Sequence, residues 1–179
     1  AQSTARAAYW AGVAADQSGQ HKAATAWYGL AARHMHTFYG QLSAYALGNP
    51  EVYYQRFFQQ TTPEAKTKAK TLRVDLVDAA TILYQMGRDE ERDLFLRALL
   101  AQSQDQPQNV IPIAQDLQSP EMALVAAKAA YEKGVLVKSA LFPKTRIPVY
   151  ADLEKNLTLG IVRQESMFDK YAISPAGAL

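Results

Sequence analysis

Glu165 differs from the other acidic residues because it continues an apolar helical pattern. Leu153, Leu157 and Ile161 precede it at steps of four residues, and on a continuous helix this spacing places all four side chains on one face. Burial among apolar neighbours disfavours an ionised carboxylate, and the negative end of the helix dipole acts in the same direction. Both effects favour the protonated carboxyl, which can donate its proton to a glycosidic oxygen as a general acid.

Spacing alone leaves alternatives for both carboxylates of this segment. Glutamate is seldom buried, so Glu165 can also simply end the helix and turn its side chain toward water. Asp169 lies four residues further on and supplies a second carboxylate if the helix continues. The Ser-Pro-Ala-Gly run at 174–177 favours the other interpretation, in which Asp169 begins an exit turn.

The remaining candidate residues do not indicate another chemistry. His34 and His36 are two residues apart, unlike the i, i+4 pair of a helical zinc site, and we expect them to be polar residues near helix ends. The sequence has no cysteine, no glycine-rich phosphate loop and no Gly-x-Ser-x-Gly nucleophile motif.

Composition limits the class of protein. The chain has 179 residues and a mass of 19.8 kDa, which suits one domain, or a small domain with part of another. Hydrophobic residues make up 49% and charged residues 20%, typical of a folded protein. A net charge of +2 does not favour nucleic acid as the main partner. No stretch reaches the roughly 20 apolar residues needed to cross a bilayer, and the first residues do not resemble a secretion signal, although export stays open.

The elements that must position these residues are helices. Apolar and small residues recur at spacings of three and four, and Gly, Pro, Ser and Thr punctuate them. The expected helices cover about 4–15, 21–31, 37–47, 72–86, 89–101, 107–117, 122–133 and 153–165. The segment 51–69 is ambiguous, with a helix start at Thr-Thr-Pro-Glu (61–64), and Pro112 falls inside a predicted helix. Trp10, Trp27 and Tyr28 are expected on buried faces opposite alanines.

This pattern predicts an all-α fold. We expect stacked antiparallel helix pairs that form part of a tetratricopeptide-like α-superhelix, without a strict 34-residue repeat. Residues 1–140 are assigned to these helices. Two prolines in 141–148 interrupt the helical texture, so 141–152 is assigned as a connector. Residues 153–179 then form a separate final segment.

The final segment resembles a known family. The order IVRQESMF (161–168) followed by ISPAGA (173–178) is similar to the opening of the catalytic domain of soluble lytic murein transglycosylases. In that family a ring of superhelical helices and a linker precede a lysozyme-like domain. TARAAYWAG and AATAWYGLAA in the first 32 residues resemble the later helices of the ring, and LFP and RIP within 141–148 resemble the approach to the catalytic domain.

The resemblance implies a function and a location. Glu165 is implied to be the single catalytic acid/base that cleaves the bond between N-acetylmuramic acid and N-acetylglucosamine in peptidoglycan, leaving a 1,6-anhydro end. One carboxyl is enough because the acetamido group of the substrate assists. Ser166 is implied to orient Glu165 by a hydrogen bond. No metal or cofactor is implied, and the substrate implies a periplasmic location.

Two family segments that shape the sugar cleft, Gly-Leu-Met-Gln and Ala-Tyr-Asn-Ala-Gly, do not occur in this sequence. A groove for several sugars cannot be built from one helix and a turn. We therefore expect the parent protein to be an enzyme and this chain alone to be inactive. Two alternatives stay open: a helical-repeat module that binds protein partners, and a lysozyme-type hydrolase.

Overall fold

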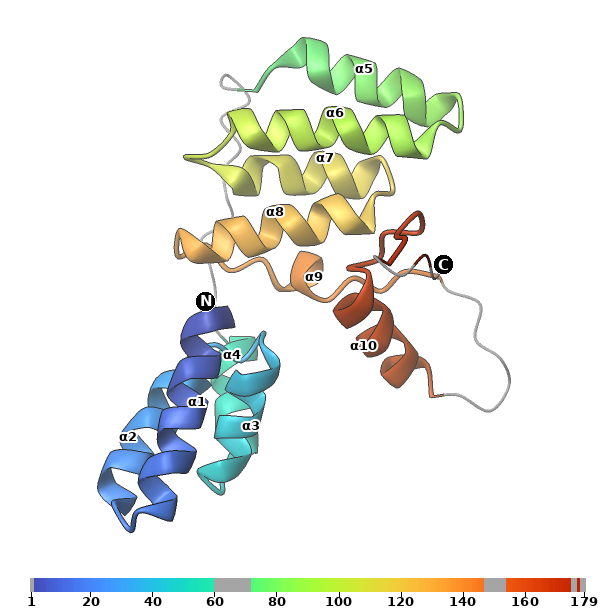
Figure 1. The fold of residues 1–179 in the computed structure, drawn as a ribbon. Helices are drawn as coiled ribbons and strands as arrows, with labels where there is room; N and C mark the ends of the chain where they lie inside the picture. Colours follow the sequence, from blue (N-terminus) through green and yellow to red (C-terminus); the bar gives the residue numbers. More distant parts are fainter. Residues whose placement is uncertain (1, 60–71, 147–153, 175–176, 178–179) are drawn as a thin grey trace. The chain divides into compact units, whose positions relative to one another are not determined.

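The structure, a computed structural model, describes residues 2–59, 72–146, 154–174 and 177. Within these residues the secondary structure consists of ten α-helices and one 3₁₀ turn, with no strand, so the all-α prediction is confirmed. The chain divides into two compact units, Ala1–Thr61 and Thr62–Leu179. Each unit is described separately below (Figure 1).

The first unit begins with a helical hairpin, α1 (Gln2–Gln17) and α2 (His21–Ala32). Gly19, with a φ of 71°, ends α1 in the left-handed conformation that glycine adopts without strain. The two helices approach closely where Tyr28 packs on Gly12: a Cβ atom at Gly12 would lie only 2.7 Å from the Tyr28 ring. The predicted pairing of a large aromatic side chain with small residues is confirmed at this contact.

The expected burial of both tryptophans is wrong. Trp10 is 55% exposed and Trp27 is 44% exposed. The physical reason is the short distance between the helices, because the buried face is made of small residues and leaves no room for an indole ring. These small residues are Ala5, Ala8, Gly12, Ala24, Ala31 and Ala32.

Two further helices complete the first unit. α3 (Phe38–Ala46) begins at Thr37, whose hydroxyl oxygen accepts a hydrogen bond of 3.0 Å from the Gly40 amide. α4 (Pro50–Gln59) begins at Pro50, in the first-turn position that tolerates proline. The sequence left 51–69 ambiguous, and α4 resolves its first part; the helix start expected at 61–64 lies outside the described residues.

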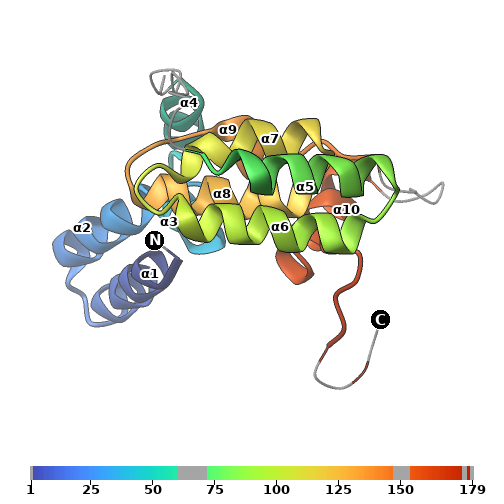
Figure 2. The same cartoon turned by 90° about the horizontal axis from the view of Figure 1, so that it is seen from above.

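The second unit contains four helices stacked in chain order, α5 (Val74–Gln85), α6 (Asp89–Gln102), α7 (Val110–Asp116) and α8 (Pro120–Glu132). Figure 2 shows them lying along a common direction. Their core includes large side chains with less than 2% exposure, among them Leu96, Leu99, Met122 and Leu124. The superhelical arrangement expected for such helices stays a prediction.

Pro112 does not end the regular structure of the segment 107–117. Pro107–Asn109 forms the 3₁₀ turn, and α7 starts directly after it. Pro112 therefore lies in the first turn of α7, where backbone N–H groups have no partner within the α-helix. Its missing donor removes no hydrogen bond, so the helix continues through it.

Two short elements lead to the end of the chain. α9 (Lys138–Leu141) is a single turn that the sequence did not indicate, and α10 (Lys155–Glu165) corresponds to the expected final helix. Residues 147–152 of the predicted connector 141–152 lie outside the described residues. α10 belongs to the same compact unit as α5–α9, and the domain boundary at 141–152 stays a prediction.

Candidate active site

Glu165 is the last residue of α10, and its side chain is exposed. Leu157 and Ile161 share its helix face and are 57% and 54% exposed. Leu153 lies outside the described residues. The predicted burial of Glu165 among apolar neighbours is therefore wrong in this structure, and the alternative that its side chain faces water is confirmed.

α10 packs through a different face, which explains this exposure. Leu159, Val162, Arg163 and Ser166 are half-buried, and their spacing of three and four residues makes them a second helical stripe. The prediction relied on the step-of-four pattern and missed this stripe. The stripe is nevertheless visible in the sequence, since Leu159 and Val162 are apolar and three residues apart.

Arg163 is the main polar anchor of α10. Its Nε donates a hydrogen bond of 2.9 Å to the carbonyl oxygen of Leu141, at the end of α9. Its guanidinium carbon lies 5.0 Å from the centre of the Phe142 ring, within the range of a cation–π interaction. Burial lowers the pKa of Arg163 from its usual value. Sequence reasoning treated Arg163 only as part of a motif.

Ser166 follows Glu165 directly and caps the helix. Its amide donates to the carbonyl oxygen of Val162 at 3.1 Å, and its hydroxyl donates to the same oxygen at 3.3 Å. The hydroxyl thus contributes to ending α10 in this structure. The predicted role of orienting the Glu165 carboxyl stays a prediction.

The chain reverses through a strained turn immediately after Ser166. Met167 and Phe168 have φ values of 54° and 69°, a left-handed conformation that costs a non-glycine residue about 1–2 kcal/mol. The ends of α1, α3, α5 and α8 place a glycine at such a position, namely Gly19, Gly48, Gly87 and Gly134. Two consecutive non-glycine residues in this conformation mark the turn after Glu165 as unusual, and such strain is concentrated at functional sites in proteins.

Asp169 belongs to this exit turn and not to α10. Its amide donates to the Ser166 carbonyl at 3.0 Å, and its carboxylate accepts a hydrogen bond of 2.8 Å from the Tyr171 amide. Because the helix ends at Glu165, Asp169 does not continue the same helix face. The exit-turn interpretation is correct.

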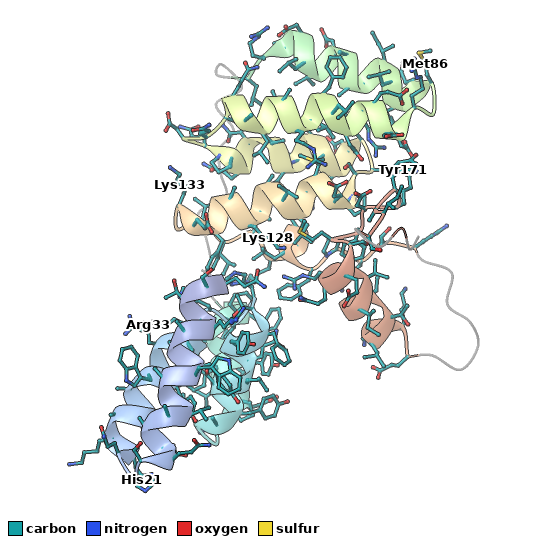
Figure 3. The ribbon with its side chains drawn as sticks, viewed as in Figure 1. His21, Arg33, Met86, Lys128, Lys133 and Tyr171 are labelled. Carbon is teal, nitrogen blue, oxygen red and sulfur yellow. The ribbon has the colours of Figure 1, made fainter. Side chains whose placement is uncertain are left out.

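Two contacts tie the exit turn to the helical stack. The Lys128 ammonium of α8 lies 3.0 Å from the Met167 sulfur, and Lys170 forms an ion pair with Asp89 at the start of α6. Lys128 and Tyr171, labelled in Figure 3, lie on α8 and in the exit turn respectively. The hydrogen bond from Lys170 holds the pKa of Asp89 below its usual value, and burial lowers the pKa of Lys128.

A cavity of about 360 Å³ lies beside the exit turn. Its lining includes Ser166 and Asp169, together with charged side chains of α6 and α8. Arg92, only 3% exposed, is neutralised there by ion pairs of 2.8 Å with both Asp89 and Asp93. The predicted site residue Ser166 therefore faces a charged, partly enclosed space, whereas Glu165 stands on the exposed end of α10.

Metal binding finds no support in the described part of the chain. His34 and His36 lie in the turn after α2, with ring centres 6.3 Å apart. No group of three or more His, Cys, Asp or Glu side chains able to hold a metal ion occurs among the described residues. No helix in the described ranges has the length and apolar character needed to cross a membrane.

Comparison of the chain with models of protein families, with curated protein sequences and with solved structures gives no match. The geometry of α10 and the sequence motif around it are therefore the observations from which a function has to be argued.

Proposed function

We propose that this chain is part of a peptidoglycan lytic transglycosylase in which Glu165 is the catalytic acid/base. The motif RQES at 163–166, followed by SPAGA at 174–178, carries the proposal. The structure supports it with one observation: the carboxyl group stands exposed at a helix end, directly before a strained two-residue turn. An exposed carboxyl is accessible to a polymeric substrate.

The proposed reaction uses one carboxyl twice. Glu165 in its acid form protonates the glycosidic oxygen between N-acetylmuramic acid and N-acetylglucosamine, which releases the leaving sugar. As a carboxylate it then accepts the proton of the muramoyl C6 hydroxyl while that oxygen bonds to C1. The product ends in 1,6-anhydro-N-acetylmuramic acid, and no water is consumed. Assistance by the substrate's acetamido group replaces a second carboxylate.

The finer architecture is part of the same proposal. We assign the helix pairs of residues 1–140 to an α-superhelix and α10 to the first helix of a lysozyme-like domain. The stacking of α5–α8 supports the first assignment. Peptidoglycan as substrate places the protein in the periplasm.

The proposal is tested on the complete protein encoded by the gene, with purified peptidoglycan sacculi as substrate. Glu165→Gln removes the proton donor and should lower the release of anhydromuropeptides by about 10²–10⁴-fold, the usual contribution of a general acid/base. Glu154→Gln is the matched control, because Glu154 precedes the same helix, is exposed and makes no side-chain capping hydrogen bond. Full activity of the Glu165 variant contradicts the proposal.

The same assay separates the hydrolase alternative by its products. A lysozyme-type hydrolase adds water and leaves reducing ends, whereas the proposed reaction leaves anhydro ends that are lighter by one water molecule. Mass spectrometry of the released muropeptides distinguishes the two. Reducing ends as the main product would show that the enzyme is a hydrolase and not a transglycosylase, with Glu165 still the proton donor.

A binding module remains the second candidate because of the aromatic surface of the first unit. Trp10, Trp27, Phe38 and Tyr45 are each more than 40% exposed, and exposed aromatic side chains are enriched where proteins bind partners. Codons for Gly-Leu-Met-Gln directly after Leu179 favour the enzyme, whereas a stop codon there favours the binding module.

A further inference from the structure

The end of α10 is fixed from two sides. On the helix side, Arg163 donates from its Nε to the Leu141 carbonyl and lies over the Phe142 ring. On the turn side, Phe168 is 9% exposed. Arg163, Phe168 and Phe142 line one cavity of about 240 Å³. Glu165 lies between the two anchored residues, two positions after Arg163 and three before Phe168.

We propose that Arg163 is a positioning residue that holds the end of α10, and with it Glu165, in the place required for acid/base catalysis. This inference rests on the proposed function. Arg163 points to α9 and not to the exposed face that carries Glu165, so it acts through the helix and not on the substrate. Through these contacts with Leu141 and Phe142, Arg163 fixes the position of the catalytic carboxyl relative to the helical stack.

The contacts require an arginine. Leu141 is fully buried, and loss of the donor to a buried carbonyl oxygen destabilises the fold. A planar guanidinium can donate through Nε while its face stacks on an aromatic ring, which a lysine ammonium cannot do. Lys128 stands on the neighbouring helix α8; burial lowers its pKa, and the positive charge of Arg163 lowers it further.

Positioning matters because the rate of a general-acid step depends steeply on geometry. A displacement of about 1 Å caused by a change remote from the reacting atoms can lower a rate by up to about 100-fold. Without Arg163, the end of α10 loses its hydrogen bond to Leu141 and its contact with Phe142, so that the half-buried Leu159 and Val162 and the turn side hold it less firmly. The carboxyl then samples a wider range of positions, which lowers kcat while substrate affinity is kept.

The test compares Arg163→Ala, Arg163→Lys and Phe142→Leu in the complete protein, with Glu165→Gln as the inactive reference. Arg163→Ala should lower kcat by at least about tenfold. KM should change less than about twofold, because Arg163 does not act on the substrate and the contacts that bind the substrate are unchanged. Arg163→Lys keeps the charge and a donor but not the planar stack, so its kcat should fall between those of wild type and alanine variant. Phe142→Leu keeps the hydrogen bond and removes the ring, and should give a smaller loss of kcat.

Arg88→Ala is the matched control, because Arg88 is an exposed arginine that pairs with Glu91 at the start of α6. Hydrogen exchange of the amides in α10 supplies a second measurement on the 179-residue chain, and should be faster in Arg163→Ala but unchanged in Arg88→Ala. If the alanine variant does not fold, Phe142→Leu carries both measurements.

The outcomes separate the two proposals. Wild-type kcat in Arg163→Ala, together with an inactive Glu165→Gln, overturns the positioning role and leaves the proposed function intact. The positioning role is also overturned if Arg163→Lys loses as much kcat as Arg163→Ala and the amides of α10 do not exchange faster in Arg163→Ala. Full activity of Glu165→Gln overturns the proposed function, and the positioning role with it.

Discussion

Arg92 and Glu121 are both buried charges near the candidate site, but their surroundings differ. Arg92 has two carboxylate partners and also donates to the Leu117 carbonyl at 3.0 Å. Glu121 pairs with Arg97 at 2.7 Å, and Arg97 is 57% exposed. A buried charge is stabilised only as far as its partners replace water. Burial therefore raises the pKa of Glu121 despite the attraction of Arg97, and Asp169 and Asp93 raise it further.

This raised pKa predicts a pH-dependent stability. A carboxyl whose pKa is higher in the folded state contributes most below its unfolded value, here 4.5, and this contribution is lost as the pH rises through the folded value. Glu121→Gln stays neutral at every pH. The free energy of unfolding of the variant relative to wild type should therefore increase as the pH rises from 4 to about 7.

Urea denaturation at a series of pH values measures this difference. Glu90→Gln is the control, because Glu90 is exposed and also lies in the first turn of a helix, α6. A difference between Glu121→Gln and wild type that stays constant, or that decreases with pH, would show that the Arg97 pair outweighs burial.

At the scale of elements, the size of the side chains on the contacting faces decides how helices pack. α1 and α2 approach closely because Gly12 leaves room for the Tyr28 ring. α10 shows the opposite case, because the face with the larger apolar side chains, Leu157 and Ile161, is exposed. Its packing face carries Arg163, whose partner Leu141 comes from a different part of the chain. Packing faces are thus chosen by the partner surface and not by hydrophobicity alone.

A pair of glycine substitutions tests the close contact of α1 with α2. Gly12→Ala places a Cβ 2.7 Å from the Tyr28 ring, and overpacking of this kind costs about 1–3 kcal/mol. Gly29→Ala, on α2, meets no atom within 4 Å and should stabilise the protein by about 0.5–1 kcal/mol, since alanine is the better helix former. Thermal or urea unfolding of both variants checks the opposite signs. Stabilisation by Gly12→Ala would contradict the tight contact.

At the scale of the whole molecule, an exposed catalytic candidate has a consequence for activity. Water competes for every polar contact of the Glu165 carboxyl, and general acids in glycosidases depend on an environment that keeps the proton bound near neutral pH. The proposed reaction also requires a groove that orients several sugars. Both requirements concern surroundings that α10 and its turn do not provide by themselves.

We therefore predict that the 179-residue chain, incubated with purified sacculi, releases no anhydromuropeptides above the level of its own Glu165→Gln variant. Liquid chromatography with mass spectrometry measures the release. The complete protein serves as the positive control for substrate and detection. Release by the wild-type chain alone, absent from the variant, would contradict the prediction and would show that α10 with its turn is sufficient for catalysis.

Helix positions followed from local sequence in most of the chain. The spacing of apolar residues placed α1, α2, α5, α6 and α8 close to their observed bounds, because helix formation and its capping depend on neighbours within a few residues. α9 was missed because a single turn has no periodicity to detect. α4 was missed in part because it has a single buried side chain, Phe57.

The candidate site was predictable in its residues but not in its surroundings. The helical fold, the end of the last helix at Glu165 and a turn near Asp169 could be predicted because these properties depend on local backbone preferences. The exposure of Glu165, the position of Trp10 and Trp27 outside the core and the contact of Arg163 with Leu141 became visible only in the packed fold. The physical reason is that burial depends on which distant segment covers a face, and that segment is set by the packing of the whole unit.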